Sequence, residues 1–131
     1  MRGHLVTSFV IALTAAPAWA DSVEDYFAFN GPATGVMAPA QIDETVIGQI
    51  QFVDVRDEAA FVRGHLPGAL HLPWAEAIER RDELPSDKKI VLYCETGLQS
   101  AQVMLGLRLL GREAAVLLGG YRDWSNNKTN K

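Results

Sequence analysis

The chain is organised around one stretch, Ile90-Val91-Leu92-Tyr93-Cys94-Glu95-Thr96-Gly97-Leu98-Gln99-Ser100. Its first four residues are apolar without polar alternation, which is typical of a strand covered on both faces by helices. Residues 100–110 are mostly apolar with polar breaks, and Gly111 after them suits a left-handed helix end. The sequence therefore predicts a strand, a loop that begins with the only cysteine, and a helix.

Cys94 is expected at the carboxyl edge of a sheet, facing backbone N–H groups where the following helix starts. Those donors and the helix dipole favour an anion, so they should stabilise the thiolate form. The alternative is a buried core cysteine, since cysteine is among the most buried residue types. A packing cysteine needs no loop and helix start directly after it, so we interpret Cys94 as a reactive thiol.

Composition narrows the class of protein. The 131 residues match one domain, and 48% hydrophobic content is ordinary for a globular chain. There are 12 Lys plus Arg against 16 Asp plus Glu with no basic cluster, so a nucleic-acid partner is not expected. A single cysteine excludes an internal disulfide, a Cys-x-x-Cys redox pair and a cysteine-rich zinc site.

Residues 1–20 have the pattern of a secretory signal peptide. Arg2 supplies a positive start, residues 5–16 are apolar, and Ala18-Trp19-Ala20 provides a cleavage pattern. The competing interpretation is a membrane anchor, but the apolar run is well short of the ~20 residues that span a bilayer. We therefore expect cleavage after Ala20, a periplasmic protein and no stable membrane insertion. Residues 21–35 form an N-terminal segment, whose aromatic side chains among acids suit a short amphipathic helix or a docking arm.

The rest of the chain alternates predicted strands and short helices. Strands are predicted over residues 34–37, 50–55, 69–72, 90–93 and 114–117, and helices over 39–48, 57–62, 74–84, 100–110 and from 119. The charge run at 79–83 is expected to be a solvated face, and residues 126–131 a polar tail. This alternation indicates an α/β domain with a mainly parallel sheet, whose sites collect at the carboxyl ends of the strands.

Four motifs follow one another in a specific order: Asp54-Val55-Arg56 at a strand end, Gly64-His65-Leu66-Pro67-Gly68-Ala69, Cys94-x-x-Gly97-x-x-Ser100 and Gly119-Gly120-x-x-x-Trp124. Together they resemble the rhodanese homology domain, over roughly Val36 to Trp124. The resemblance implies a single-domain sulfurtransferase at 36–125, with a five-stranded, mainly parallel sheet flanked by helices. With the signal peptide, the chain is similar to the small periplasmic members. No cofactor and no metal are expected.

In that family the loop after the cysteine curls into a cradle whose amides point at the sulfur, so the resemblance implies a substrate-binding loop over Glu95 to Ser100. Cys94 would attack the outer sulfur of a donor such as thiosulfate, become a persulfide and pass the sulfur to cyanide, a thiol or a thiol protein. Gly97 is expected to let the backbone turn closely around the sulfur without a Cβ clash. Ser100 is expected to cap the following helix.

The loop departs from the pattern of thiosulfate-using members, many of which carry basic residues there. Here the loop side chains are Glu95, Thr96, Leu98 and Gln99. An acid next to Cys94 should raise the pKa of the thiol and repel a dianionic donor. A neutral or protein-borne persulfide therefore fits the loop as well as thiosulfate does.

Other candidate residues support the site less directly. Asp54 and Arg56 lie at a strand end and could approach the thiol, although a mutual or helix-capping salt link is the simpler use. His65 invites a Cys/His dyad, but the resemblance places it in a turn. His65, His71 and Cys94 match no usual zinc spacing, so no metal site is predicted.

Two other functions share parts of this pattern. A cysteine phosphatase or arsenate reductase also holds a thiolate in an anion-binding loop, but it places an arginine where this chain has Ser100. The non-enzymatic alternative is a low-activity sulfur-relay or protein-binding module, which recognises a partner through the loop and the aromatic residues of 21–29.

Overall fold

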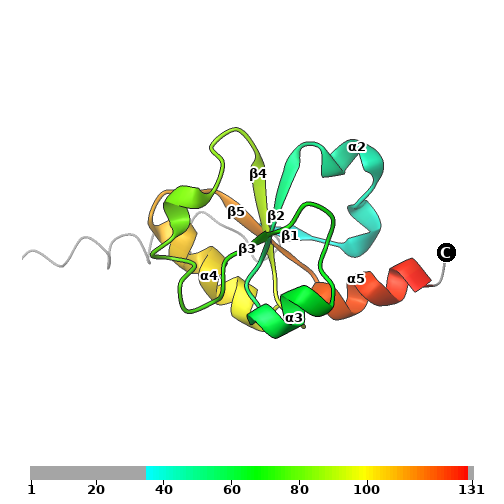
Figure 1. The fold of residues 1–131 in the computed structure, drawn as a ribbon. Helices are drawn as coiled ribbons and strands as arrows, with labels where there is room; N and C mark the ends of the chain where they lie inside the picture. The colour runs from blue at the N-terminus through cyan, green and yellow to red at the C-terminus, as the bar shows by residue number, and fades with distance from the viewer. Residues whose placement is uncertain (1–34, 130–131) are drawn as a thin grey trace, which may run out of the picture.

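The computed structural model describes residues 35–129, which form one five-stranded parallel sheet with helices on both faces (Figure 1). The strand order is β1-β5-β4-β2-β3, so β4 is central. The strands are β1 (Val36–Met37), β2 (Ile50–Asp54), β3 (Leu70–His71), β4 (Lys89–Tyr93) and β5 (Ala114–Leu117). All four pairings are parallel, which confirms the predicted α/β class.

Within residues 35–129, five helices lie between strands and α5 follows the last strand. They are the 3-10 helices η1 (Pro39–Gln41) and η2 (Arg81–Glu83) and the α-helices α2 (Glu44–Ile47), α3 (Glu58–Arg63), α4 (Leu98–Leu109) and α5 (Gly120–Thr129). Figure 1 shows α4 and α5 on opposite sides of the sheet, with α3 between them at the lower edge. No helix among the described residues is long and apolar enough to cross a membrane.

The central strand buries side chains on both faces, as its unbroken apolar run predicts. Ile90 and Leu92 pack with α4 and the segment 74–84, while Val91 and Tyr93 pack with α2 and α5. All four are at most 2% exposed. Full burial of one such aliphatic side chain contributes roughly 1.5–3 kcal/mol to stability, so β4 anchors both layers.

Helix α4 begins earlier than predicted, whereas the predicted helix end at Gly111 is confirmed. It begins at Leu98 rather than Ser100, with Gly97 at the N-cap in the left-handed region (φ 104°). At the other end Gly111 has φ 78°. The N–H groups of Gly111 and Arg112 donate to the carbonyls of Arg108 and Leu107, which is the Schellman arrangement.

Two segments predicted as continuous helices are not continuous in the structure. The helix expected over 39–48 is two pieces, because Asp43 accepts hydrogen bonds from the backbone of Thr45 and Val46 and starts α2 anew. The helix expected over 74–84 is a series of turns followed by η2. That segment contributes only Ala77, Ile78 and Leu84 to the core, and tertiary packing is the main source of helix stability.

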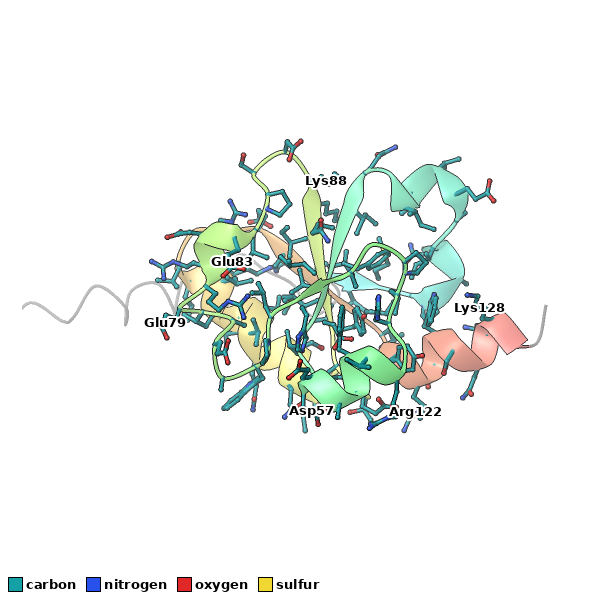
Figure 2. The ribbon with its side chains drawn as sticks, viewed as in Figure 1. Asp57, Glu79, Glu83, Lys88, Arg122 and Lys128 are labelled. Carbon is teal, nitrogen blue, oxygen red and sulfur yellow. The ribbon has the colours of Figure 1, made fainter. Side chains whose placement is uncertain are left out.

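The remaining predictions concern the C-terminal tail, the charged run 79–83 and the N-terminal residues. Helix α5 runs to Thr129, so part of the predicted polar tail is helical. The charged run 79–83 is largely solvated, and Figure 2 shows Glu79 and Glu83 on the outer side of the molecule. The predicted signal peptide at 1–20 and the aromatic residues of 21–29 lie outside the described residues.

Candidate active site

Strands β2 and β4 end side by side, and this brings the predicted site residues together. Asp54 pairs in register with Tyr93, and the N–H of Val55 donates to the Tyr93 carbonyl at 3.0 Å. Arg56 and Cys94 therefore leave the sheet at the same carboxyl edge. Helices α3, α4 and α5 begin near this edge (Figure 1).

The loop after Cys94 turns its backbone toward the sulfur. The N–H of Gly97 lies 3.1 Å from the Cys94 Sγ, and the Ser100 hydroxyl lies 3.7 Å from it. Cys94 is 2% exposed and Ser100 is fully buried. The intervening side chains are solvent-exposed instead, namely those of Glu95, Thr96, Leu98 and Gln99. The inner surface of the loop is thus made of amides and one hydroxyl.

These donors control the ionisation of the thiol. Burial opposes the charged form and would raise the pKa of Cys94. Hydrogen bonds from the backbone and hydroxyl of Ser100 and from the N–H groups of Thr96 and Gly97 outweigh burial, so the pKa of Cys94 is lowered from its ordinary value. This favours a thiolate, the nucleophilic form of cysteine.

The expected cap role of Ser100 was wrong, and the turn at Gly97 was right for a different reason. Ser100 lies inside the first turn of α4 and does not cap it; its hydroxyl lies 3.0 Å from the Gly97 carbonyl as well as facing the sulfur. A Cβ on Gly97 would meet the Leu117 carbonyl at 3.6 Å, an ordinary contact. Glycine is required there by its positive φ and not by lack of space.

Gly120 has a role that sequence reasoning missed. A Cβ on this residue would lie 2.5 Å from the Cys94 carbonyl oxygen and 2.7 Å from the Glu95 carbonyl. The N–H of Tyr121 donates to the Cys94 carbonyl at 2.8 Å, and that of Arg122 to the Glu95 carbonyl at 3.1 Å. The start of α5 therefore holds the chain at Cys94 from behind. The Gly119-Gly120 pair was the only signal of this packing in the sequence.

Arg56 joins four parts of the site. Its guanidinium pairs with the buried Asp54 at 2.6 Å, which confirms the predicted salt link, and donates to the Gly64 carbonyl at 2.6 Å. It lies 4.0 Å from the centre of the Tyr121 ring and 3.3 Å from the Glu95 carboxylate. Burial disfavours its charge, but the Asp54 carboxylate more than compensates and raises the pKa of Arg56. Arg56 is thus a permanent cation beneath the loop.

The contact with Arg56 changes the expected effect of Glu95. One Glu95 carboxylate oxygen faces the Arg56 guanidinium, and the largest influences on the pKa of Cys94 are burial and the hydrogen bonds from Ser100, Thr96 and Gly97. The expected upward effect of this acid does not set the direction of the shift, because the pKa of Cys94 is lowered overall. A nearby cation offsets the carboxylate, and the amides nearer to the sulfur dominate.

A depression of about 500 Å³ lies beside the loop. Glu95 and Gln99 line it from the loop, and Arg56, Asp57, Ala60 and Arg63 line it from β2 and α3. The remaining lining residues are Val55, Pro73 and Trp74. Its volume lies within the usual range of small-molecule sites, roughly 300–1,000 Å³.

The two histidines described by the structure have partners other than the thiol. His65 stacks on Phe61 and its Nδ1 lies 2.9 Å from the Phe61 carbonyl. His71 also stacks on Phe61, and its Nε2 lies 2.9 Å from the Arg56 carbonyl. No group of three or more metal-ligating residues occurs among residues 35–129. Ser100, buried where a phosphatase loop would carry its arginine, provides no guanidinium to clamp an oxyanion.

Comparison with known proteins agrees with this geometry. The family described as "Rhodanese-like domain" matches residues 39–127. The chain is 33% identical to the thiosulfate sulfurtransferase GlpE of Coxiella burnetii over 76 residues, which is 57% of this chain and 71% of GlpE. It is 35% identical to the uncharacterized protein YqhL of Bacillus subtilis over 75 residues, which is 56% of this chain and 60% of YqhL.

A solved structure shows the same fold. The rhodanese-related protein of Thermoplasma volcanium superimposes with a TM-score of 0.66 at 25% identity, covering 70% of this chain and 91% of that protein. The parallel sheet, the loop of amides around Cys94 and the family match over most of the described residues lead to one assignment: the chain belongs to the rhodanese-like domain family.

Proposed function

We propose that this protein is a sulfurtransferase that carries sulfane sulfur as a persulfide on Cys94. The observation that supports this most is the convergence of the Gly97 N–H and the Ser100 hydroxyl on a buried sulfur whose pKa is lowered. A structural cysteine does not need donors around its sulfur. A thiolate and a terminal persulfide anion both do, because each is a buried negative charge.

The proposed reaction has two balanced steps. In the first, the Cys94 thiolate attacks the outer sulfur of a donor, a new S–S bond forms, and the bond within the donor breaks. With thiosulfate the leaving group is sulfite, which takes the electron pair of the broken bond. In the second, cyanide or a thiolate attacks the outer sulfur of the persulfide, and the Cys94 thiolate leaves. The acceptor gains the sulfur and the enzyme returns to its starting state.

The test is to incubate the purified protein with thiosulfate and with low-molecular-weight persulfides and to measure intact mass. We expect a gain of about 32 Da, one sulfur atom, on Cys94 and none in Cys94→Ser. Addition of cyanide or a thiol should remove the gain and release thiocyanate or a new persulfide. If no donor produces a Cys94-dependent gain, the proposed enzyme is wrong, and a binding module of the same fold becomes the better account.

We also propose that the protein acts outside the cytoplasm after removal of residues 1–20. The support is the charged start, apolar stretch and Ala-x-Ala pattern of the sequence. Expression of the full chain in a bacterium, followed by fractionation and N-terminal sequencing, should give a periplasmic product that begins at Asp21. Recovery of the uncleaved chain from the membrane or cytoplasm would contradict export.

A further inference from the structure

The depression beside the catalytic loop has a balanced set of charges. Its lining contains two cations, Arg56 and Arg63, and two carboxylates, Asp57 and Glu95. Two of these charges already have structural roles. Arg56 is buried against Asp54, and the Asp57 carboxylate caps α3 by accepting from the Ala60 N–H at 2.7 Å.

The other two groups, Arg63 and Glu95, keep bonding capacity for a ligand. The Arg63 side chain is exposed and makes no hydrogen bond or ion pair with any described residue. Glu95 is 58% exposed at its side chain and uses one carboxylate oxygen, Oε2, toward Arg56. Its second oxygen has no hydrogen-bond partner within residues 35–129. The depression therefore offers one unpaired cation, Arg63, and one unpartnered oxygen of a carboxylate whose other oxygen faces Arg56.

Apolar surface lies in the same depression. Val55, Ala60 and Pro73 contribute to the lining, and Trp74 is 47% exposed. A dianion such as thiosulfate would meet no excess of positive charge here and would leave most of this lining unused. A molecule with a carboxylate, an ammonium group and a short carbon skeleton matches both charges and the apolar surface.

Resting on the proposed sulfur transfer, we propose that the donor is the persulfide of a zwitterionic aminothiol, an amino acid or small peptide whose leaving part occupies this depression. The donor carboxylate pairs with Arg63, and the donor ammonium pairs with the free oxygen of Glu95. The Cys94 thiolate attacks the outer sulfur of the donor, the donor S–S bond breaks, and the aminothiol leaves as a thiolate. Cys94 then carries the outer sulfur of the donor, with its proton, as a persulfide.

Four donors that differ in which charged groups their carbon skeleton carries test this subsite. They are the persulfides of cysteine, 3-mercaptopropionate, cysteamine and 2-mercaptoethanol, which carry both charges, the carboxylate, the ammonium or neither. The measurement is the initial rate of Cys94 persulfidation at several donor concentrations, which gives kcat/KM for each donor. We expect cysteine persulfide to be used best and 2-mercaptoethanol persulfide least well.

Two charge-removing variants assign the two contacts. In Arg63→Gln the ratio of kcat/KM for the 3-mercaptopropionate donor to that for the 2-mercaptoethanol donor should fall about three- to ten-fold. In Glu95→Gln the ratio of kcat/KM for the cysteamine donor to that for the 2-mercaptoethanol donor should fall by a similar factor. Ratios are used because they cancel any common effect on Cys94. Lys88→Gln is the control, since Lys88 is exposed at the opposite end of the sheet from Asp57 (Figure 2).

The outcomes separate the two proposals. Equal use of all four donors, or ratios that Arg63→Gln and Glu95→Gln leave unchanged, would overturn the zwitterion subsite while Cys94 still accepts sulfur. Absence of a persulfide with every donor would instead overturn the sulfurtransferase itself. A fall of the carboxylate ratio in Arg63→Gln but not in Lys88→Gln supports the subsite.

Discussion

At the scale of a residue, the chemistry depends on what surrounds one sulfur atom. Cys94 is buried, and burial alone would keep its thiol neutral. The loop compensates with backbone donors, which cost nothing to orient because the loop already holds them in place. Ser100 adds the one side-chain donor, from a fully buried position in α4.

Ser100→Ala should raise the pKa of Cys94, because it removes the hydroxyl that faces the sulfur. It should also cost about 0.5–1.5 kcal/mol of stability through the lost hydrogen bond to the Gly97 carbonyl. The pKa is measured from the pH dependence of alkylation by iodoacetamide, and stability from urea unfolding. Ser86→Ala, at an exposed turn, is the control. An unchanged alkylation midpoint in Ser100→Ala would mean that the hydroxyl does not stabilise the thiolate.

The lowered pKa of Cys94 predicts how alkylation of the wild-type thiol changes with pH. Its pKa is lowered from the ordinary value of a cysteine thiol by the hydrogen bonds to its sulfur, so the thiolate forms at a lower pH than in an unperturbed cysteine. We expect the alkylation rate to reach its plateau at a lower pH than for a free cysteine peptide. The lowered pKa also affects the free energy of unfolding. The stabilisation that comes from the thiolate form of Cys94 is fully present above the unfolded-state pKa and is lost as pH falls through the folded-state pKa. A midpoint at or above the peptide value would contradict the arrangement of donors.

At the scale of elements, the loop after Cys94 is held between two helix starts. Helix α4 begins within the loop at Leu98, and α5 begins behind it at Gly120. The backbone of α5 donates to the carbonyls of Cys94 and Glu95, and Gly120 permits this close approach. The position of the sulfur therefore depends on an element that follows it by more than twenty residues.

Gly120→Ala tests this support. The new Cβ would overlap the backbone of Cys94 and Glu95, and φ of 63° is unfavourable for alanine. We expect a loss of at least ~2 kcal/mol in unfolding free energy and a large fall in Cys94 persulfidation. Gly111→Ala is the matched control, with φ of 78° but no atom within 4 Å of the new Cβ. It should cost only ~1–2 kcal/mol for the backbone and leave the rate of persulfidation at its wild-type value. Equal effects of the two substitutions would rule out a specific role for the α5 contact.

At the scale of the whole molecule, Arg56 connects segments that are distant in sequence. It pairs with Asp54 at the end of β2, donates to the carbonyl of Gly64, stacks on Tyr121 of α5 and faces Glu95 of the loop. Tyr93 adds a second link, since its hydroxyl accepts from the Leu66 N–H at 3.0 Å. The carboxyl edge of the sheet is thus one connected polar network under the active loop.

Arg56→Gln should destabilise the fold strongly, because it leaves the Asp54 carboxylate buried without its cation. The expected loss is about 3–5 kcal/mol in urea unfolding. Arg80→Gln makes the same chemical change at a more exposed ion pair with Glu76 and Glu83, and it should cost less than about 1 kcal/mol. Similar losses in both variants would show that the Arg56 network is not a structural centre.

Much of this molecule followed from its sequence alone. The unbroken apolar run before Cys94, the recurring strand patterns and the helix stop at Gly111 are local signals, and local signals specify strands and helix ends. They predicted the parallel sheet, the central strand and the position of Cys94 at the edge of the sheet. The salt link between Asp54 and Arg56 was also predicted, because two opposite charges at a strand end are close in sequence.

Only the tertiary structure decided which donors face the sulfur and where each charge is directed. Ser100 faces the thiol because α4 starts two residues earlier than its composition indicates. Glu95 faces Arg56, and Gly120 supports Cys94, because β2, β4 and α5 meet at one edge. Such contacts depend on atoms tens of residues apart, so no periodicity or spacing along the chain encodes them. The sequence determined the sheet and the place of the cysteine at its edge, and packing at the carboxyl edge determined the electrostatic environment of that cysteine.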